Sequence, residues 1–229
     1  MRPGEPTPPA SRATTQDTLP SPEATAALAT RLESQPVLVV RQYREPWEWI
    51  AGFEMRNRYL VSDERGGPIA WAAEHQQGVL AFLLRQLLGH WRKFEIQFFD
   101  EAHRPVLRAV HPFRWFFKRL EVHGSDGRKL GAIQQRFSLL KKSFDVEDSR
   151  GVVLMRVRSG LFRPWRFDFE RNGRAVARVQ KRWTGLLTEA FTDTDNFGVS
   201  FEQSLGAQER LLVLAAALFV DLRYFERKA

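Results

Sequence analysis

The chain has 229 residues, 43% of them hydrophobic, which is enough for one domain with a substantial core. It contains no cysteine, which excludes disulfide bonds, a cysteine nucleophile and thiolate metal sites. A formal net charge of +8 favours a polyanionic partner, either an anionic membrane surface or a nucleic acid, although a basic soluble protein without such a partner has the same composition.

Residues 1–35 differ in composition from the rest of the chain. They are rich in proline and contain no tryptophan, phenylalanine or lysine. Such a segment buries too little apolar surface to offset its chain entropy, so we expect a disordered tail, with a weak helix at residues 23–33. The tail also lacks the basic start and continuous apolar run of a secretory signal, so we do not expect export by that route.

From residue 37 onward the chain alternates between strand-like segments and turn signals. The segments are rich in β-branched and aromatic residues and lie at 37–42, 59–62, 94–98, 120–122, 152–157 and 166–170. Glycine-containing turn signals stand at 63–67, 125–127, 148–151 and 171–173, and they supply the positive φ angles that hairpins need. The pattern predicts a mainly antiparallel β domain over residues 36–229.

An internal repeat favours a closed sheet. Residues 126–137 align without gaps on residues 172–183, and similar aromatic and basic segments precede both blocks. Two related meanders that close on each other leave no exposed sheet edge, so we predict a β-barrel.

Two segments have helical character. Residues 76–88 are rich in leucine and predict a short helix over the barrel. A second helix is predicted at about 207–225, and its uninterrupted apolar run covers only residues 211–220. Because a membrane span needs about 20 apolar residues, we expect this helix inside the barrel, while membrane insertion and an oligomer contact stay open as alternatives. The residues expected at its buried positions are Leu211, Leu214, Leu218 and Phe219.

Five short motifs together resemble the phospholipid scramblase family. They are VLVVRQ at 37–42, GFEMRNRY at 52–59, QKRWTG at 180–185, EAFTDTDNFG at 189–198 and LFVDLRYFE at 218–226. The resemblance implies a tubby-like fold, a closed antiparallel barrel of about twelve strands threaded by the C-terminal hydrophobic helix. It also implies calcium-dependent, ATP-independent, bidirectional movement of phospholipids between membrane leaflets. A non-catalytic barrel that binds anionic lipids or phosphoinositides is the alternative.

The resemblance further implies a cytoplasmic protein, peripheral at the plasma or inner membrane. Animal members of the family carry palmitoylated cysteines near residues 112–118, which this chain lacks. A membrane interface or anion-binding site could instead use basic and aromatic residues, and the alternative is that they alternate between core and surface on strands. These residues are Arg114, Trp115, Lys118, Lys181 and Arg182.

The basic residues of the two repeat blocks suit a nucleic acid as well as lipid phosphates. A stripe for nucleic acid would combine Arg136, Lys141, Lys142, Arg178, Lys181 and Arg182 with Phe137 and Trp183. No recognition helix, zinc finger or RNA-binding signature accompanies these residues, so nucleic acid is the second choice of partner.

The family's proposed calcium loop corresponds here to residues 193–204. In EF-hand order the candidate ligands are Asp193, Asp195, Phe197, Val199, Phe201 and Ser204. Two carboxylates are in place, but Ser204 stands where a bidentate acid belongs, so we expect weak Ca²⁺ binding. The alternative is a turn in which Phe197 and Phe201 pack into the barrel. Catalytic motifs are absent from the sequence and the five histidines are scattered, so we expect no covalent chemistry.

Overall fold

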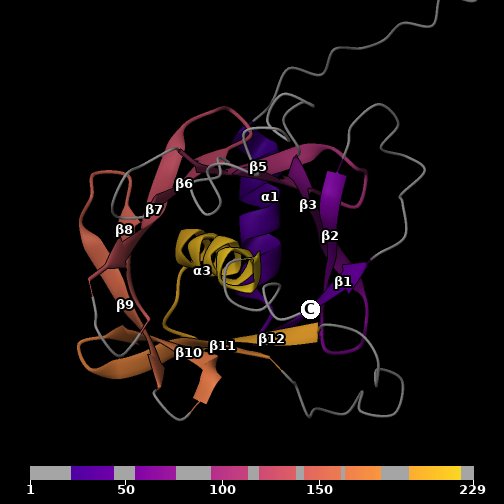
Figure 1. The fold of residues 1–229 in the computed structure, drawn as a ribbon. Helices are drawn as coiled ribbons and strands as arrows, with labels where there is room; N and C mark the ends of the chain where they lie inside the picture. The colour runs from indigo at the N-terminus through magenta and orange to yellow at the C-terminus, as the bar shows by residue number, and fades with distance from the viewer. Residues whose placement is uncertain are drawn as a thin grey trace, which may run out of the picture.

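Twelve antiparallel strands close into one barrel in the computed structural model, which describes residues 22–43, 55–75, 94–112, 119–137, 142–160, 163–181 and 196–222. Figure 1 looks along the barrel, whose closure joins β1 to both β2 and β12. The strands are β1 (Val37–Tyr43), β2 (Met55–Ser62), β3 (Pro68–His75), β4 (Phe94–Phe99), β5 (Pro105–His111), β6 (Arg119–Gly124), β7 (Lys129–Arg136), β8 (Ser143–Asp148), β9 (Val153–Gly160), β10 (Arg163–Arg171), β11 (Arg174–Lys181) and β12 (Asn196–Phe201). The predicted fold class is confirmed.

Helix α3 (Ala207–Val220) runs through the barrel and supplies much of its core. Leu211, Leu214, Leu218 and Phe219 are each at most 1% exposed, and Phe219 stacks on Phe94 of β4. The helix is surrounded by inward-facing side chains of the strands, as expected for an apolar segment too short to span a bilayer. The structure therefore places α3 inside the barrel, as expected from the sequence.

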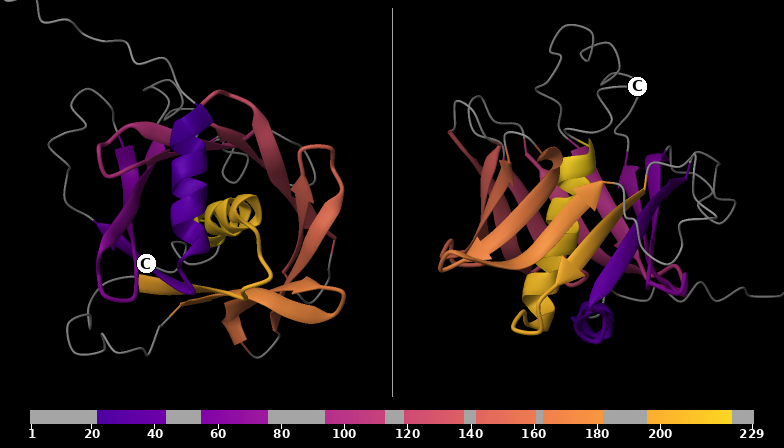
Figure 2. Two further views of the ribbon diagram at one scale, coloured as in Figure 1. Left: turned by 180° about the vertical axis from the view of Figure 1, so that it is seen from behind. Right: turned by 90° about the horizontal axis from the view of Figure 1, so that it is seen from below.

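Helix α1 (Pro22–Glu33) moves the start of the folded domain from residue 36 to Pro22. Figure 2 shows it lying across one end of the barrel, beside the start of α3. Leu28 and Leu32 are 4% and 0% exposed, and the hydroxyl of Thr25 donates to the carbonyl of Val106 at 2.6 Å. Helix α1 lies where a weak helix was expected, at residues 23–33, and it buries its apolar face against the rest of the domain.

The two ends of the barrel differ. The turns between strands that the structure describes all lie at the end where α3 begins, which we call the turn end. The strand ends at the other end border the residues that the structure does not describe. Asn172 and Gly173, with φ of 52° and 78°, form the two-residue turn that their sequence predicts. The two repeat blocks correspond to β7 and β11, each with its preceding turn. The helix predicted at residues 76–88 falls outside the described residues.

Candidate lipid-facing surface

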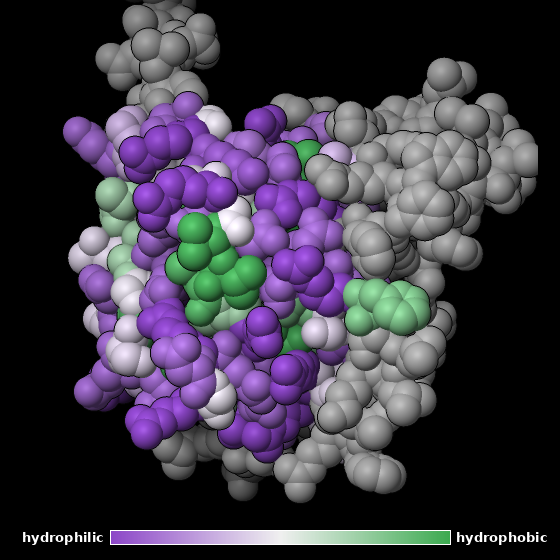
Figure 3. All heavy atoms as spheres, turned by 90° about the vertical axis from the view of Figure 1, so that its left-hand side faces the viewer, coloured by the Kyte–Doolittle hydropathy of each residue, from purple (hydrophilic) through white to green (hydrophobic). Residues whose placement is uncertain are grey.

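The outer surface of the barrel is mostly hydrophilic on the side of β7, β8 and β9. Figure 3 shows this side as a polar surface with one compact hydrophobic area near its centre. Because α3 fills the barrel interior, a ligand could contact the described strands mainly on their outer surface and at their ends.

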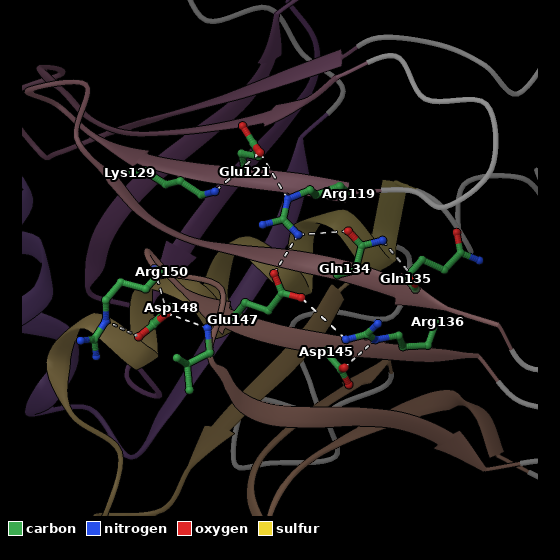
Figure 4. Close-up of polar contacts among 11 residues, drawn as sticks. Arg119, Glu121, Lys129, Gln134, Gln135, Arg136, Asp145, Glu147, Asp148 and Arg150 are labelled. Carbon is green, nitrogen blue, oxygen red and sulfur yellow. Dashed lines mark hydrogen bonds and ion pairs between the residues drawn. The ribbon is translucent and has the colours of Figure 1, made fainter.

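The wall formed by β6, β7 and β8 is electrically balanced. Its three strands carry three basic and four acidic side chains. Arg119 contacts Glu147 at 2.7 Å and Glu121 at 3.2 Å, and Arg136 contacts Asp145 at 2.6 Å, as the dashed lines of Figure 4 show. These cations are already neutralised by neighbouring strands, so this wall has little charge to offer an anion.

The wall formed by β9, β10 and β11 has a large excess of positive charge. Its strands carry eight basic and only two acidic side chains. The basic residues are Arg156, Arg158, Arg163, Arg166, Arg171, Arg174, Arg178 and Lys181. Since the whole chain has a formal net charge of +8, most of its excess positive charge lies on these three strands. We call this surface the basic wall.

One carboxylate organises the middle of the basic wall. Asp168 lies between Arg166, at 2.9 Å, and Arg178, at 2.7 Å. Burial by itself would raise the pKa of Asp168, but hydrogen bonds from the two arginines outweigh it and hold the pKa below its usual range. Asp168 therefore stays ionised and fixes the two guanidinium groups side by side, with a net positive charge left over.

A groove runs beside β9 and β10 near the turn end. Its volume is about 710 Å³, and its lining includes Arg156, Arg158, Glu170 and Arg171. Arg158 is 3.8 Å from Glu170, Arg171 is hydrogen-bonded to Glu209, and Arg156 makes no ion pair with any described residue. The groove therefore offers two loosely held cations to an anion from outside.

The residues predicted for a membrane or nucleic-acid interface are only partly within the described chain. Lys181 ends β11, whereas Arg114, Trp115, Lys118 and Arg182 lie outside the described residues. Arg136 and Arg178, both candidates for a nucleic-acid stripe, are paired with Asp145 and Asp168. Their strands, β7 and β11, are separated by β8, β9 and β10, so the repeat blocks do not adjoin as one stripe on the barrel wall.

The described part of the predicted calcium loop is a strand. Phe197, Val199 and Phe201 lie on β12 with 1%, 0% and 8% exposure, and their side chains belong to the barrel core. Four steps along an extended strand span roughly 13 Å, so Phe197 and Phe201 cannot both contact one ion. Ser204 follows at the turn end. The EF-hand order of ligands is therefore not adopted from Phe197 to Ser204, and Asp193 and Asp195 lie outside the described residues.

Among the described residues, no group of three or more His, Asp or Glu side chains is arranged to hold a metal ion. None of the helices in the same residues combines the length and the apolar character that a membrane crossing requires.

Comparison with known protein families gives the affiliation. The family model described as Scramblase matches residues 15–227. The chain belongs to the Scramblase family. The match covers every described strand and helix, so the basic wall and the internal helix are parts of a scramblase-family domain.

Curated relatives of this Scramblase-family protein share about a quarter of its residues. Human phospholipid scramblase 2 is 25% identical over 211 residues, covering 83% of this chain and 68% of the relative. Bovine phospholipid scramblase 2 is 28% identical over 207 residues, covering 82% and 68%. A phospholipid scramblase family protein of Schizosaccharomyces pombe is 25% identical over 235 residues, covering 87% and 62%. An X-ray structure of an Arabidopsis thaliana protein matches 89% of this chain and 98% of its own length, with a TM-score of 0.45 and 13% identity.

Proposed function

We propose that this Scramblase-family protein binds anionic phospholipid membranes peripherally through the basic wall and moves phospholipids between leaflets. The observation that carries the proposal is the charge of β9, β10 and β11, which carry eight basic and only two acidic side chains. Lipid phosphates and carboxylates accept hydrogen bonds from guanidinium groups, and basic residues near an anionic leaflet are attracted to its negative surface potential.

Movement in both directions without ATP follows if the protein only lowers the barrier for a headgroup to cross the hydrocarbon layer. The barrel does not carry the headgroup through its middle, because α3 fills the interior with apolar side chains. We infer that the lipid headgroup travels along the outside of the protein, where cations of the basic wall offset the loss of hydration.

The filled interior also favours a second candidate function. A barrel with a solid core and a basic wall is sufficient for binding anionic lipids or phosphoinositides without moving them. The two functions share a membrane-binding step and differ only in whether labelled lipid changes leaflet.

Calcium dependence is part of the proposal through Asp193 and Asp195. Both are carboxylates, the ligand type that Ca²⁺ prefers, and with Phe197 to Ser204 held in and beyond β12 the remaining ligands would come from other groups or from lipid phosphates. Sparse protein ligands predict binding at the weak end of the calcium range.

A liposome experiment tests the function. The protein is reconstituted with headgroup-labelled lipid, and an impermeant reductant bleaches only the label on the outer leaflet. Scrambling exposes the inner label, so bleaching exceeds the outer-leaflet fraction; bleaching equal to that of protein-free liposomes contradicts scrambling. Calcium is varied with wild type and Asp193→Ala, and an equal calcium response in both rules out that residue as a ligand.

A competition experiment separates lipid from nucleic acid. Sedimentation with phosphatidylserine-containing vesicles is measured with and without duplex DNA at one salt concentration. We expect vesicle binding to persist, and transfer of the protein to DNA would favour the nucleic-acid alternative.

A further inference from the structure

Four turns at the turn end share one five-residue geometry. They occupy residues 63–67, 100–104, 124–128 and 148–152. In each, the first N–H donates to the fifth carbonyl and the fourth N–H donates to the first carbonyl. The fourth residue always has a positive φ, between 60° at His103 and 88° at Gly151. The backbone geometry is therefore the same in the four turns, so it does not explain why their residues differ at the other positions.

The fifth position shows such a difference. It is Gly67, Arg104 and Arg128 in three turns, and Val152 in the turn between β8 and β9. Because the same backbone forms with glycine or arginine at this position, the turn does not require a valine. Val153 follows, where the other turns continue with Pro68, Pro105 and Lys129.

Both valines face solvent. Val152 is 55% exposed and Val153 is 41% exposed, and they are two of the four large exposed hydrophobic residues in the described chain. The strands that this turn joins, β8 and β9, belong to the side of the barrel drawn in Figure 3, which is mostly polar. An exposed apolar pair that neither the turn nor the core uses indicates a contact with something outside the chain.

The turn fixes the backbone at Val152. The Asp148 carboxylate accepts the N–H groups of Arg150, at 2.9 Å, and Val152, at 2.8 Å, contacts drawn in Figure 4. The hydrogen bond from Val152, followed by that from Arg150, lowers the pKa of Asp148, so the carboxylate keeps its charge for the turn. The valines are thus presented without an ordering cost at the moment of contact.

Cations lie on both sides of the valine pair along the chain. Arg150 is 83% exposed, and Arg156 and Arg158 project from β9 at the edge of the 710 Å³ groove. Apolar side chains flanked by arginines are typical of segments that insert shallowly into the headgroup layer of an anionic membrane. A nucleic acid would meet the same arginines, but it offers no apolar layer for the valines.

We propose that the β8–β9 turn and the start of β9 form the docking edge, with Val152 and Val153 inserted among the acyl chains and Arg156 and Arg158 on lipid phosphates. The docking edge lays the basic wall along the bilayer. The proposal rests on the proposed function and specifies its membrane contact, but docking by this edge is a separate claim from lipid movement.

A fluorescence experiment tests insertion directly. Since the chain has no cysteine, Val152→Cys provides a single site for an environment-sensitive fluorophore. Arg65→Cys is the control, because Arg65 is an exposed residue in a turn of the same geometry, between β2 and β3 on the opposite side of the barrel. With phosphatidylserine-containing vesicles we expect a blue shift at position 152 and none at position 65. No shift at position 152 while the protein sediments with the vesicles overturns the proposal.

Binding measurements separate the two kinds of contact. Arg156→Gln with Arg158→Gln should weaken vesicle binding by roughly 25-fold, since each basic side chain near an anionic surface contributes about five-fold. The control Arg65→Gln with Arg104→Gln removes the same charge elsewhere and should leave binding within about two-fold of wild type. Val152→Ser with Val153→Ser should weaken binding by roughly ten-fold at low and high salt alike, because burial of apolar surface is not screened by ions.

Other outcomes assign the edge differently. Equal losses from the two arginine pairs would show binding by net charge alone, and a dimer that Val152→Ser converts to a monomer would make the edge a contact between copies of the chain. Either outcome overturns the proposal. Vesicle binding and scrambling that survive the loss of the docking edge would overturn this inference and leave the proposed function standing, whereas normal docking without scrambling would do the reverse.

Discussion

Tyr59 donates its phenolic hydroxyl to the carboxylate of Asp221 at 2.9 Å inside the barrel. Tyr59 belongs to β2, Asp221 follows the last residue of α3, and their exposures are 0% and 1%. This bond ties the end of the central helix to the wall around it, in a place where neither group reaches water.

Tyr59→Phe should therefore destabilise the fold by about 1.5–3 kcal/mol, because it removes a donor from a buried carboxylate. Urea unfolding followed by tryptophan fluorescence measures the change. Tyr43→Phe is the control, since no hydrogen bond joins the Tyr43 hydroxyl to a described residue, and it should cost under about 0.5 kcal/mol. Equal losses in the two variants would show that the bond to Asp221 adds nothing.

Arg210→Met should release α1 from the barrel. Arg210 is 3% exposed. Its guanidinium group donates to the carbonyls of Leu32, at 2.9 Å, and Gln35, at 2.6 Å, at the end of α1. Burial lowers the pKa of Arg210 and nearby Glu33 partly restores it. Hydrogen exchange should show α1 losing protection before the strands, with a stability loss of about 2–3 kcal/mol.

The control for this change lies on the same helix. Gln208→Ala removes a bond to the carbonyl of Leu130 on β7, at 2.9 Å, and leaves Arg210 in place. Protection of α1 should be unchanged in this variant. If α1 exchanges equally fast in both, Arg210 is not what holds it.

Gly131→Ala should destabilise the barrel by about 1–3 kcal/mol through overpacking. An added Cβ at Gly131 would lie 2.3 Å from the carbonyl oxygen of Glu147 and 2.9 Å from Leu212 of α3. Gly206→Ala is the comparison, because a Cβ there meets nothing within 4 Å. Thermal or urea unfolding that ranks Gly206→Ala as the more harmful change would contradict the close approach of α3 to β7.

Acid should weaken the fold partly through Asp168. Its folded pKa lies below the unfolded value of about 3.9, so the unfolded chain takes up the proton first as pH falls. The stabilisation is complete at neutral pH and is lost as pH falls from about 4 through the folded pKa. Asp168→Asn should lower stability at neutral pH and flatten its decline on acidification, measured as urea midpoints across that range. An unchanged pH profile would mean that the two arginines do not stabilise the carboxylate.

The strands and the central helix could be predicted because their signals are local. Turns such as Asn172-Gly173 mark their own positions, and the short apolar run from Leu211 to Val220 limits that helix to the protein interior. Helix α1 was expected only as a weak helix in a tail, because composition does not show that it packs on the barrel. Leu28 and Leu32 are ordinary residues in a proline-rich segment until α3 and β5 provide the surface that buries them.

The sequence alone predicts less about the candidate surface, because it does not show which arginines are paired with acids. Arginines at positions 136 and 178 look alike in the two repeat blocks, and only the strand register places Asp145 and Asp168 beside them. The docking edge is visible in the sequence, since DERGG at 63–67 and DSRGV at 148–152 share Asp, Arg and Gly at the first, third and fourth positions and differ at the second and fifth. The valine at position 152 can be interpreted only with the structure, which shows that both segments form turns of the same geometry.

The central position of α3 has a consequence for how the protein is made. All twelve strands precede the helix in the chain, and β1 must pair with β12 to complete the wall. During synthesis the apolar inward faces of the strands therefore stay uncovered until the residues of α3, after Ala207, have left the ribosome. A chain stopped before Ala207 should collapse into aggregates rather than a smaller barrel, and the longer chain should need protection by chaperones until α3 has been made.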